Sequence, residues 1–441
     1  FESKLKLEDM SEKKPHIVAT GIPLLDTSKF LGIDPSDKKY CTIEATVVTG
    51  FETVAKLECE SKINTEAFAC RGRILFDCEI GDVSKVLQLR SIDSVRVIAN
   101  FFPGIKFSAD KGNDVEIFER FADKVYWDKV LDIWKNSKKF TGSIKPQLDF
   151  TPESLAATGI TFPNFRVTCH RTGTHSFGSP DAACAFGSSF FRKFGWCVKM
   201  KGFDIEILLN IEEGIFCFLK LVVTLIPLTF FILDFIHVCV PLNCESLHCR
   251  NIKYFGPTTL RSTICHNMLL LGYIKPGDIV CDPLCGSGSI PIEGSLTHNA
   301  YFLCGDNHEQ AIENSRKNAV YASEIASKSM SLDICCLDAT HLPFRDNMVD
   351  VCITDLPFGK RMGSKYNNKF LYDKVLAEMA RITQLINGRA IILTQDKSNI
   401  IKTIQRLNKF WTVARRLNVN IGGLSGLVHV LQRTNLSCPQ K

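Results

Sequence analysis

The feature that most constrains this chain is a series of short apolar runs after residue 254, each followed closely by an acidic residue. Runs of this length are typical of strands buried in a parallel sheet. Open α/β sheets bind ligands at the carboxyl ends of their strands, so we expect the acidic residues to share one edge. The pattern predicts a Rossmann-like α/β domain over residues 254–441; incidental acids on a generic fold of that type are the alternative. The acidic residues are Asp282, Asp306, Asp338 and Asp355.

A glycine-containing loop follows the first of these predicted strands. Residues 283–289 carry glycines at 286 and 288 and lead into a helix predicted from Ile290 to His298. Two glycines let the backbone approach a ligand closely. The loop has neither the third glycine of the dinucleotide fingerprint nor the Gly-Lys-Ser/Thr of a Walker loop. Asp306 follows it by roughly twenty residues, where an acceptor for a ribose diol is expected, and Asp338 is placed to hold an adenine amino group.

The fourth apolar run, Val349 to Thr354, ends in the tetrapeptide Asp-Leu-Pro-Phe at 355–358. The Asp355 side chain and the carbonyl before Pro357 can accept hydrogen bonds from an exocyclic amine. Proline has no N–H and a fixed φ, which points that carbonyl outward. Phe358 offers a flat face on which a base could stack. Taken alone, the tetrapeptide is equally consistent with an ordinary turn at the end of a strand.

The length, net charge and cysteine content of the chain limit the classes of protein to which it can belong. A chain of 441 residues predicts two or three domains. The net charge of +6 permits a polyanionic partner without demanding one. The 19 cysteines are dispersed, which favours reduced thiols in the cytosol or nucleus over a disulfide framework. Four residues close in sequence do not fit a standard zinc spacing, so free thiols are favoured there and a zinc site is the alternative; they are Cys239, Cys244, His248 and Cys249.

The N-terminal half predicts two small α+β units joined by a linker. Residues 1–40 form a tail, and 41–110 alternate strand and helix in a pattern typical of a ferredoxin-like domain. A linker at 111–162 contains one predicted helix, from Val115 to Trp134. The second unit, 163–253, has strands at 165–169 and 203–209, a polar loop at 170–173 and a helix at 181–194. The basic and hydroxyl residues of that loop suit a phosphate backbone as well as they suit plain solvent.

Residues 215–240 are almost continuously apolar. Their length matches that of a membrane-spanning helix. Lys220, Pro227, Asp234 and His237 interrupt the stretch, however, and charges at membrane depth are costly. A buried hairpin or an apolar insertion at about 218–238 is therefore favoured over a membrane span.

Together these motifs resemble the class I S-adenosylmethionine-dependent methyltransferases. Residues 282–288 are similar to the cofactor loop of that family. Residues 355–358 are similar to the Asp/Asn-Pro-Pro-Tyr/Phe motif of enzymes that methylate exocyclic or amide nitrogens, with Leu356 replacing the first proline. Across residues 41–433 the chain further resembles the THUMP-containing tRNA guanine-N2-methyltransferases. The segments that carry this likeness are 49–52, 71–74, 165–169, 245–252, 255–261, 290–294, 359–364 and 419–424.

The resemblance implies an enzyme that transfers a methyl group from S-adenosylmethionine to the N2 amine of a guanosine in tRNA. It implies that Asp355 and the Leu356 carbonyl hold the amine, with Pro357 shaping the turn and Phe358 stacking on the guanine. Contacts with the RNA backbone are expected at Arg171, Arg261, Lys360 and Arg361. The implied cofactor-binding residues are Asp282, Pro283, Cys285, Gly286, Gly288, Asp306, Asp338 and Ala339.

The resemblance also implies partners and a compartment. The N-terminal units look like modules that grip the acceptor end of tRNA, and the family implies a small zinc-binding activator subunit at the edge of the methyltransferase sheet. The cytoplasm is expected, with the nucleus as the alternative. Two other functions stay open at this point: a methyltransferase for adenine N6 or glutamine N5, and a non-catalytic RNA-binding protein. The chain departs from the family in its apolar stretch, and at Leu284 and Ser287, where relatives often carry Met and Thr.

Overall fold

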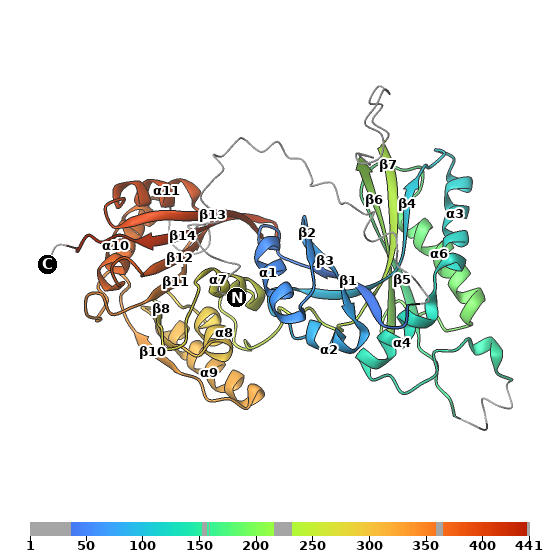
Figure 1. Ribbon diagram of the computed structural model, residues 1–441, viewed down its shortest axis with the longest axis horizontal. Helices are drawn as coiled ribbons and strands as arrows, with labels where there is room; N and C mark the ends of the chain where they lie inside the picture. Colours follow the sequence, from blue (N-terminus) through green and yellow to red (C-terminus); the bar gives the residue numbers. More distant parts are fainter. Residues whose placement is uncertain (1–36, 152–156, 158, 216–231, 359–364, 439–441) are drawn as a thin grey trace. The chain divides into compact units, whose positions relative to one another are not determined.

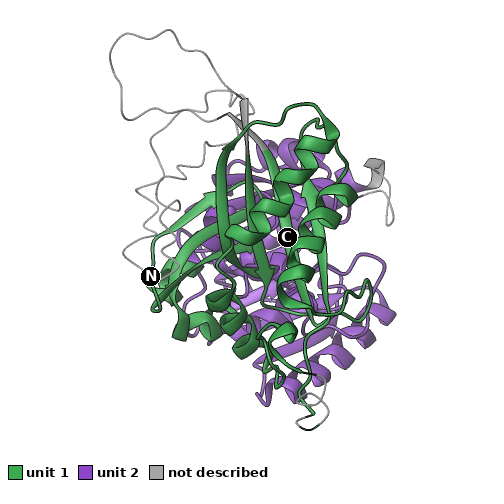
Figure 2. Cartoon of the chain, turned by 90° about the vertical axis from the view of Figure 1, so that its right-hand side faces the viewer, with its two compact units in different colours: residues 1–46, 59–89, 94–244 green, residues 47–58, 90–93, 245–441 purple. Residues whose placement is uncertain are grey.

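The computed structural model describes residues 37–151, 157, 159–215, 232–358 and 365–438. The chain divides into two compact units, which are coloured separately in Figure 2. The first unit contains residues 1–46, 59–89 and 94–244, and the second contains 47–58, 90–93 and 245–441. The predicted tail at 1–40 therefore lies mostly outside the described residues.

The first unit is built on one seven-stranded sheet in the order β2-β3-β1-β4-β7-β6-β5. Strands from both predicted N-terminal domains share this sheet, because β4 pairs with β7 in antiparallel fashion. Among the described strands of this sheet, β5 and β6 form the one parallel pair. The strand β2 has no counterpart in the sequence prediction. The bounds are β1 Tyr40–Thr46, β2 Ala67–Cys70, β3 Arg73–Glu79, β4 Ser94–Ile105, β5 Phe165–Arg171, β6 Ile205–Ile215 and β7 Ile232–Pro241.

Two predictions for this unit are corrected, one by its helices and one by strand β5. The single helix expected from Val115 to Trp134 is two helices, because Val125 adopts an extended conformation between them. The indole of Trp127 then donates a hydrogen bond to the Ala122 carbonyl across the break, at 3.1 Å. The polar loop expected at 170–173 is also partly wrong, since β5 continues to Arg171. The bounds are α2 Val83–Val86, α3 Lys111–Lys124, α4 Trp127–Lys138 and α6 Ser179–Phe194; α1, Glu52–Ile63, is divided between the two units.

Both described ends of the apolar stretch are β-structure. The strand β6 ends at Ile215 and β7 begins at Ile232, and these two residues are partners in the antiparallel register. Residues 232–238 of the stretch belong to β7, and 216–231 lie outside the described residues. Among the helices that the structure describes, none has the length and apolarity needed to span a bilayer.

The second unit is a doubly wound sheet in the order β10-β9-β8-β11-β12-β14-β13. The pairs from β10 to β12 are parallel, and β14 is antiparallel to β12 and β13. The sheet's order reverses between β8 and β11, which is where such folds bind ligands. This confirms the four predicted strands that precede acidic residues. The bounds are β8 Ile279–Asp282, β9 Tyr301–Asp306, β10 Leu332–Cys336, β11 Val351–Asp355, β12 Arg389–Thr394, β13 Trp411–Ile421 and β14 Leu424–Arg433.

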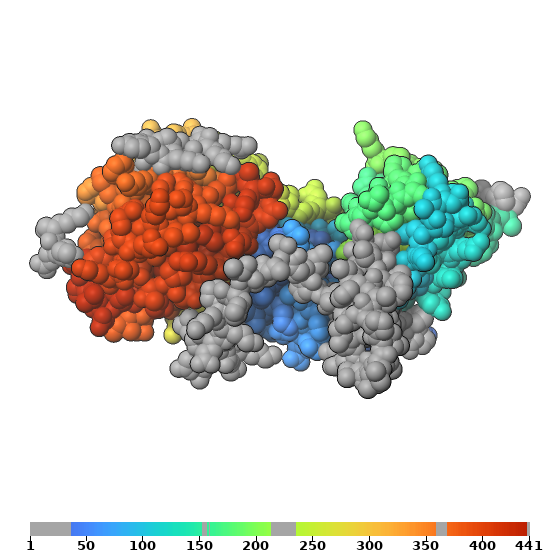
Figure 3. Space-filling view, turned by 90° about the horizontal axis from the view of Figure 1, so that it is seen from above, coloured from blue at the N-terminus to red at the C-terminus, as the bar shows by residue number. Residues whose placement is uncertain are grey.

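Helices cover both faces of this sheet, with α10 and α11 on one face and α7, α8 and α9 on the other (Figure 1). The α10 and α11 side buries a single apolar cluster that includes Cys352, Tyr372, Ile392 and Trp411. The C-terminal elements, orange to red, form much of the surface of this unit in Figure 3. The bounds are α7 Ser262–Leu271, α8 Ser289–Thr297, α9 Glu309–Ala326, α10 Lys365–Ile382 and α11 Lys397–Arg406.

Buried ion pairs explain why two N-terminal segments belong to the second unit. Glu293 on α8 is fully buried and accepts two hydrogen bonds from Arg90, at 2.6 and 2.9 Å. Arg250 also pairs with Glu293, at 3.1 Å. Glu58 accepts from the Ser91 amide, at 2.9 Å, and from His266 on α7, at 3.1 Å. A buried carboxylate needs such partners to offset its lost hydration.

Candidate active site

The four predicted carboxylates all lie at the carboxyl ends of strands in the parallel part of the second sheet. Asp282, Asp306 and Asp355 are the last residues of β8, β9 and β11, and Asp338 follows β10 by two residues. Because β10, β9, β8 and β11 are successive neighbours, these side chains occupy one edge of the sheet. The structure thus brings together the groups that the sequence pattern predicted would meet.

The loop after β8 has the backbone shape of a ligand loop. Gly286 and Gly288 both have positive φ, at 53° and 83°. A Cβ on Gly286 would meet nothing within 4 Å, so the backbone there borders open space, whereas one on Gly288 would strike Ser315 at 2.8 Å. Pro283 is buried, and the Cys285 amide donates to the Gly305 carbonyl at 2.8 Å. The loop is therefore fixed on its inner side and open on its outer side.

The carboxylates after β9 and β10 are anchored differently. Asp306 accepts hydrogen bonds from the amides of Gly286, at 3.1 Å, and His308, at 3.0 Å. It therefore ties the loop to the end of β9. Asp338 is exposed, and one of its oxygens accepts from the backbone and the hydroxyl of Thr340, both at 2.8 Å. The hydrogen bonds from Thr340 lower the pKa of Asp338. Ala339 beside it is buried.

The tetrapeptide after β11 is held rigidly from one side. Tyr372 and Asn368 donate hydrogen bonds to the Pro357 carbonyl, at 2.6 and 3.0 Å. Leu356 is fully buried, and its amide donates to Leu393 on β12. Phe358 is half-buried. The Pro357 carbonyl is thus already occupied, and the carbonyl that precedes Pro357 stays the predicted acceptor for a substrate amine. Sequence reasoning missed Tyr372 and Asn368 because nothing in their spacing links them to the turn.

Asp282 and Asp355 are unusually placed for carboxyl groups. Asp282 is 3% exposed, and burial raises its pKa to about 7. Part of Asp355 reaches the surface, yet its Oδ1 is enclosed and has no hydrogen-bond partner in the part of the chain that the structure describes. Burial, and then the charge of Asp282, raise the pKa of Asp355 well above its usual range. A positively charged ligand or an amine would stabilise the ionised form of these two carboxyl groups, so they are suited to bind one.

The segment before α7 that contains Tyr254, Gly256 and Thr259 contacts the cofactor loop. Sequence reasoning assigned no such role to this segment. The Gly256 amide donates to the hydroxyls of Ser287 and Thr259, at 3.0 and 2.7 Å. Asn318 on α9 donates to the carbonyls of Tyr254 and Ser287, at 2.9 and 3.0 Å. Ser287, noted only as a departure from relatives, therefore helps to position the loop.

The predicted RNA contacts are distributed over both units. Arg261 precedes α7 and is exposed, and its guanidinium lies 3.9 Å from the position that a Cβ on Gly422 would take. Arg171 ends β5 in the first unit, where it contacts the Gly173 carbonyl and His175. Lys360 and Arg361 lie outside the described residues.

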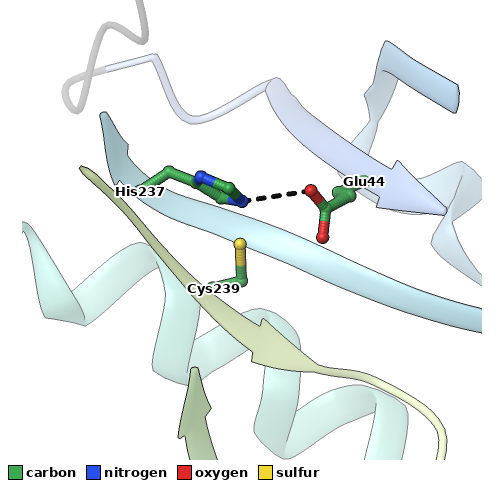
Figure 4. Close-up of side chains that lie close together, drawn as sticks. All are labelled: Glu44, His237 and Cys239. Carbon is green, nitrogen blue, oxygen red and sulfur yellow. Dashed lines mark hydrogen bonds and ion pairs between the residues drawn. The ribbon is translucent and has the colours of Figure 1, made fainter. Parts of the chain in front are cut away.

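The candidate zinc ligands do not gather into a site within the described residues. The His/Cys/carboxylate group that does gather there is Glu44, His237 and Cys239 (Figure 4). Its carboxylate is already occupied, since Glu44 accepts from His237 at 3.1 Å, Arg73 at 2.9 Å and Arg96 at 2.8 Å. Two guanidinium groups would repel a cation, and burial raises the pKa of the Cys239 thiol well above its usual value. This cluster is an ion-pair network.

The donor set at the edge of the second sheet fits S-adenosylmethionine. Carboxylates suit its ribose and its positive charges, and the open side of the loop at Gly286 leaves room for close backbone approach. The unpartnered Oδ1 of Asp355 is an acceptor without a donor, as a site for an amine requires.

Comparisons with known proteins agree with this geometry. Residues 250–426 match the family model of the RMKL-like methyltransferase domain. The chain is 33% identical to the Bos taurus tRNA (guanine(6)-N(2))-methyltransferase THUMP3, with 90% of each chain covered. It is 24% identical to the Bos taurus U6 snRNA (guanine-N(2))-methyltransferase THUMPD2, covering 58% of this chain and 45% of that one. Among solved structures, TrmN from Thermus thermophilus has a TM-score of 0.64 at 22% identity, covering 89% and 99%.

Proposed function

This chain belongs to the THUMP3-type family of tRNA guanine-N2-methyltransferases, and we propose that it methylates the exocyclic N2 of a guanosine in tRNA. It is a methyltransferase, and its cofactor is S-adenosylmethionine. We propose the guanosine at position 6 as its target, which is the position in the names of its relatives. The cofactor supplies an activated methyl group on a sulfonium.

One observation carries the substrate part of this proposal: Asp355 Oδ1, at the end of β11 beside the cofactor loop, is buried and has no hydrogen-bond partner among the described residues. A buried acceptor without a donor costs free energy, about 1–3 kcal/mol, unless a ligand supplies the donor. An exocyclic amine has two N–H groups. Asp355 accepts one of them, and the Leu356 carbonyl accepts the other.

The remaining residues of the turn position the base. A guanine must leave its stack to reach the site. Phe358 stacks on the extruded base, and the hydrogen bonds from Tyr372 and Asn368 to Pro357 keep the turn from moving away. Rate enhancement then comes mainly from orientation of the amine lone pair toward the methyl group and from local electrostatics.

The N-terminal units would select the RNA. We propose that they form a ferredoxin-like and a THUMP module that grip the acceptor end by its shape and its phosphates. Arg171 and Arg261, together with Lys360 and Arg361, would contact the backbone. The similarity to a U6 snRNA enzyme makes that RNA the second substrate to test. We find no observation that favours adenine or glutamine.

A small zinc-binding activator subunit is proposed as a protein partner. The strand β10 is the outermost strand of its sheet, and no strand pairs with its outer side among the described residues. Such an edge can accept a further strand from a partner. We also propose that the protein acts in the cytoplasm.

Nucleoside analysis of RNA treated with the purified full chain tests the function. Unmodified tRNA and U6 snRNA are incubated with the enzyme and S-adenosylmethionine, with and without the activator subunit. N2-methylguanosine at position 6 of tRNA is the expected product. Methylated adenosine, or N2-methylguanosine in U6 snRNA alone, would contradict the proposal, and the arm without activator decides whether the subunit is required.

A further inference from the structure

Asp282 and Asp355 lie on the same face of two neighbouring strands. The strands β8 and β11 pair in parallel with Cys281 beside Cys352, which places Ile353 beside Asp282. Side chains two residues apart on a strand point to the same face. Asp355 therefore stands diagonally beyond Asp282 on that face, at the edge where the cofactor loop begins.

The pair has little to neutralise it. The Thr354 hydroxyl and the Leu284 amide, which donates to Asp282 at 3.2 Å, act to lower the pKa of Asp282, but neither carries a charge. Among the described residues, Asp355 Oδ1 has no hydrogen-bond donor. Within the described ranges, the titratable groups that interact electrostatically with either carboxyl are three thiols, a phenol and another carboxyl, with no cation among them. They are Cys265 on α7, Cys281 on β8, Cys304 and Asp306 on β9, and Tyr372 on α10.

Two enclosed carboxyls without a counter-ion do not both ionise readily, because each charge disfavours the other and neither is well hydrated. The pKa values agree with this arrangement, since those of both Asp282 and Asp355 are raised, first by burial. Among the described residues, the two carboxyls therefore lack one positive charge.

We propose that Asp282 and Asp355 form a proton-exchanging pair, which holds a proton in the cofactor-free enzyme and gives it up to solvent when the sulfonium of S-adenosylmethionine is bound. In this pair Asp355 contacts the substrate, whereas Asp282 is a positioning residue that sets the charge of Asp355. The proposal depends on the proposed function only in that the protein binds S-adenosylmethionine, whichever RNA it methylates.

Bonds, electrons and protons balance over one catalytic turnover. As the bond between methyl carbon and guanine nitrogen forms, the carbon–sulfur bond breaks and its electron pair stays on sulfur. The product S-adenosylhomocysteine carries no sulfonium charge, so the site again lacks a cation. The proton that leaves the N2 amine passes to the Asp355 carboxylate. The pair then holds it until the next S-adenosylmethionine is bound.

This exchange would distinguish the methyl donor from the spent cofactor. Binding of the donor is coupled to proton release, so its affinity rises with pH while the pair titrates, by at most about tenfold per pH unit. Binding of S-adenosylhomocysteine needs no such release. The ratio of the two affinities should therefore increase from about pH 6 toward pH 8, around the pKa of about 7 at Asp282.

Isothermal titration calorimetry of the full chain without RNA tests the exchange. Titrations near pH 7 in two buffers with different ionisation enthalpies give the number of protons released on binding. We expect about one proton for S-adenosylmethionine and for sinefungin, whose amine replaces the sulfonium, and close to none for S-adenosylhomocysteine. Equal release with all of these compounds overturns the proposal. A wrong RNA substrate would not affect the result.

Two variants locate the proton. Asp282→Asn should abolish the difference in proton release between the charged and uncharged ligands, and Asp333→Asn, in an exposed carboxyl of β10, should preserve it. An unchanged difference in Asp282→Asn overturns the role of that residue. If this variant does not bind the ligands, Asp355→Asn decides, because the proposal requires that it too abolish the difference.

Discussion

Each unit of this protein buries a cluster built around a carboxylate, and the two clusters are constructed in opposite ways. In the first unit, Glu44 is surrounded by His237, Arg73 and Arg96, which hold its pKa well below the usual range although burial acts to raise it. In the second unit, Asp282 and Asp355 have no described cation beside them, and their pKa values are raised. The same physical cost of burial is offset by protein groups in one case and left for a ligand in the other.

The contrast separates groups that stabilise a fold from groups that do chemistry. The Glu44 network joins β1, β3, β4 and β7, so its hydrogen bonds fix the register across both halves of the first sheet. The Asp282 and Asp355 pair makes no ion pair within the described residues, and in the proposed exchange the cofactor supplies the missing charge. Four substitutions test this contrast.

The largest effect is expected at Asp355. Its replacement by Ala removes the acceptor that orients the amine, so turnover should fall by at least about 100-fold. Affinity for S-adenosylhomocysteine should change little. N2-methylguanosine formation, measured by nucleoside analysis, gives the first quantity and calorimetry the second. Turnover near that of the wild type would remove Asp355 from the mechanism.

Glu44→Gln tests the satisfied cluster. The substitution removes the buried carboxylate that pairs with the half-buried guanidinium groups of Arg73 and Arg96, of which Arg73 keeps Glu212, so the free energy of unfolding should drop by about 2–4 kcal/mol. Urea denaturation measures this loss. The exposed Glu116, which pairs with Arg120 on the surface of α3, provides the control, because Glu116→Gln should leave the urea midpoint unchanged. A smaller effect at Glu44 than at Glu116 would contradict the assignment.

Whereas Glu44→Gln should destabilise the protein, Asp282→Asn should stabilise the cofactor-free protein. The pKa of Asp282 is raised from 3.8 to about 7, so the folded state binds its proton more tightly and the wild type loses stability as pH rises through that window. Because the amide side chain in the variant does not titrate, Asp282→Asn does not lose stability in this way as pH rises. At pH 8 it should be more stable by about 1–3 kcal/mol, and at pH 4 by almost nothing.

Thermal unfolding of both proteins across this pH range checks the sign. Glu44 should give the opposite pH dependence, because its pKa is lowered from 4.5: its contribution is present above about pH 4.5 and disappears as pH falls below that value. Destabilisation by Asp282→Asn at pH 8 would show that its carboxylate has a counter-ion.

The smallest effect is expected at Tyr372. Replacement by Phe removes its hydrogen bonds to the Pro357 carbonyl and the Thr394 hydroxyl while keeping the ring in the core. The loss of stability should be about 1 kcal/mol. Turnover should fall by about tenfold with KM for the cofactor unchanged, since only the turn loosens. Steady-state kinetics separates this result from a general loss of folding, in which both parameters would change.

The sequence predicted the catalytic domain well because its signals are local. An apolar run followed by an acid is visible in the chain, and parallel topology alone implies that these acids share one edge of the sheet. They are Asp282, Asp306, Asp338 and Asp355. Contacts between distant residues left no such signal. Tyr372 is separated from Pro357 by 15 residues, and its role depends on how α10 packs. The break at Val125 was likewise hidden, because the apolar positions continue through it.

One consequence concerns the order in which this chain can fold as it is synthesised. Residues 47–58 belong to the second unit, where the Asn420 amide on β13 donates to the Thr49 carbonyl, and a Cβ on Gly50 would lie only 2.0 Å from the Asn418 carbonyl oxygen. Residues 47–58 therefore cannot complete their contacts until β13 has been synthesised much later. Contacts of such long sequence separation form slowly. A catalytic fragment beginning at residue 245 would lack Glu58 and Arg90, which are hydrogen-bond partners of the buried His266 and Glu293 side chains.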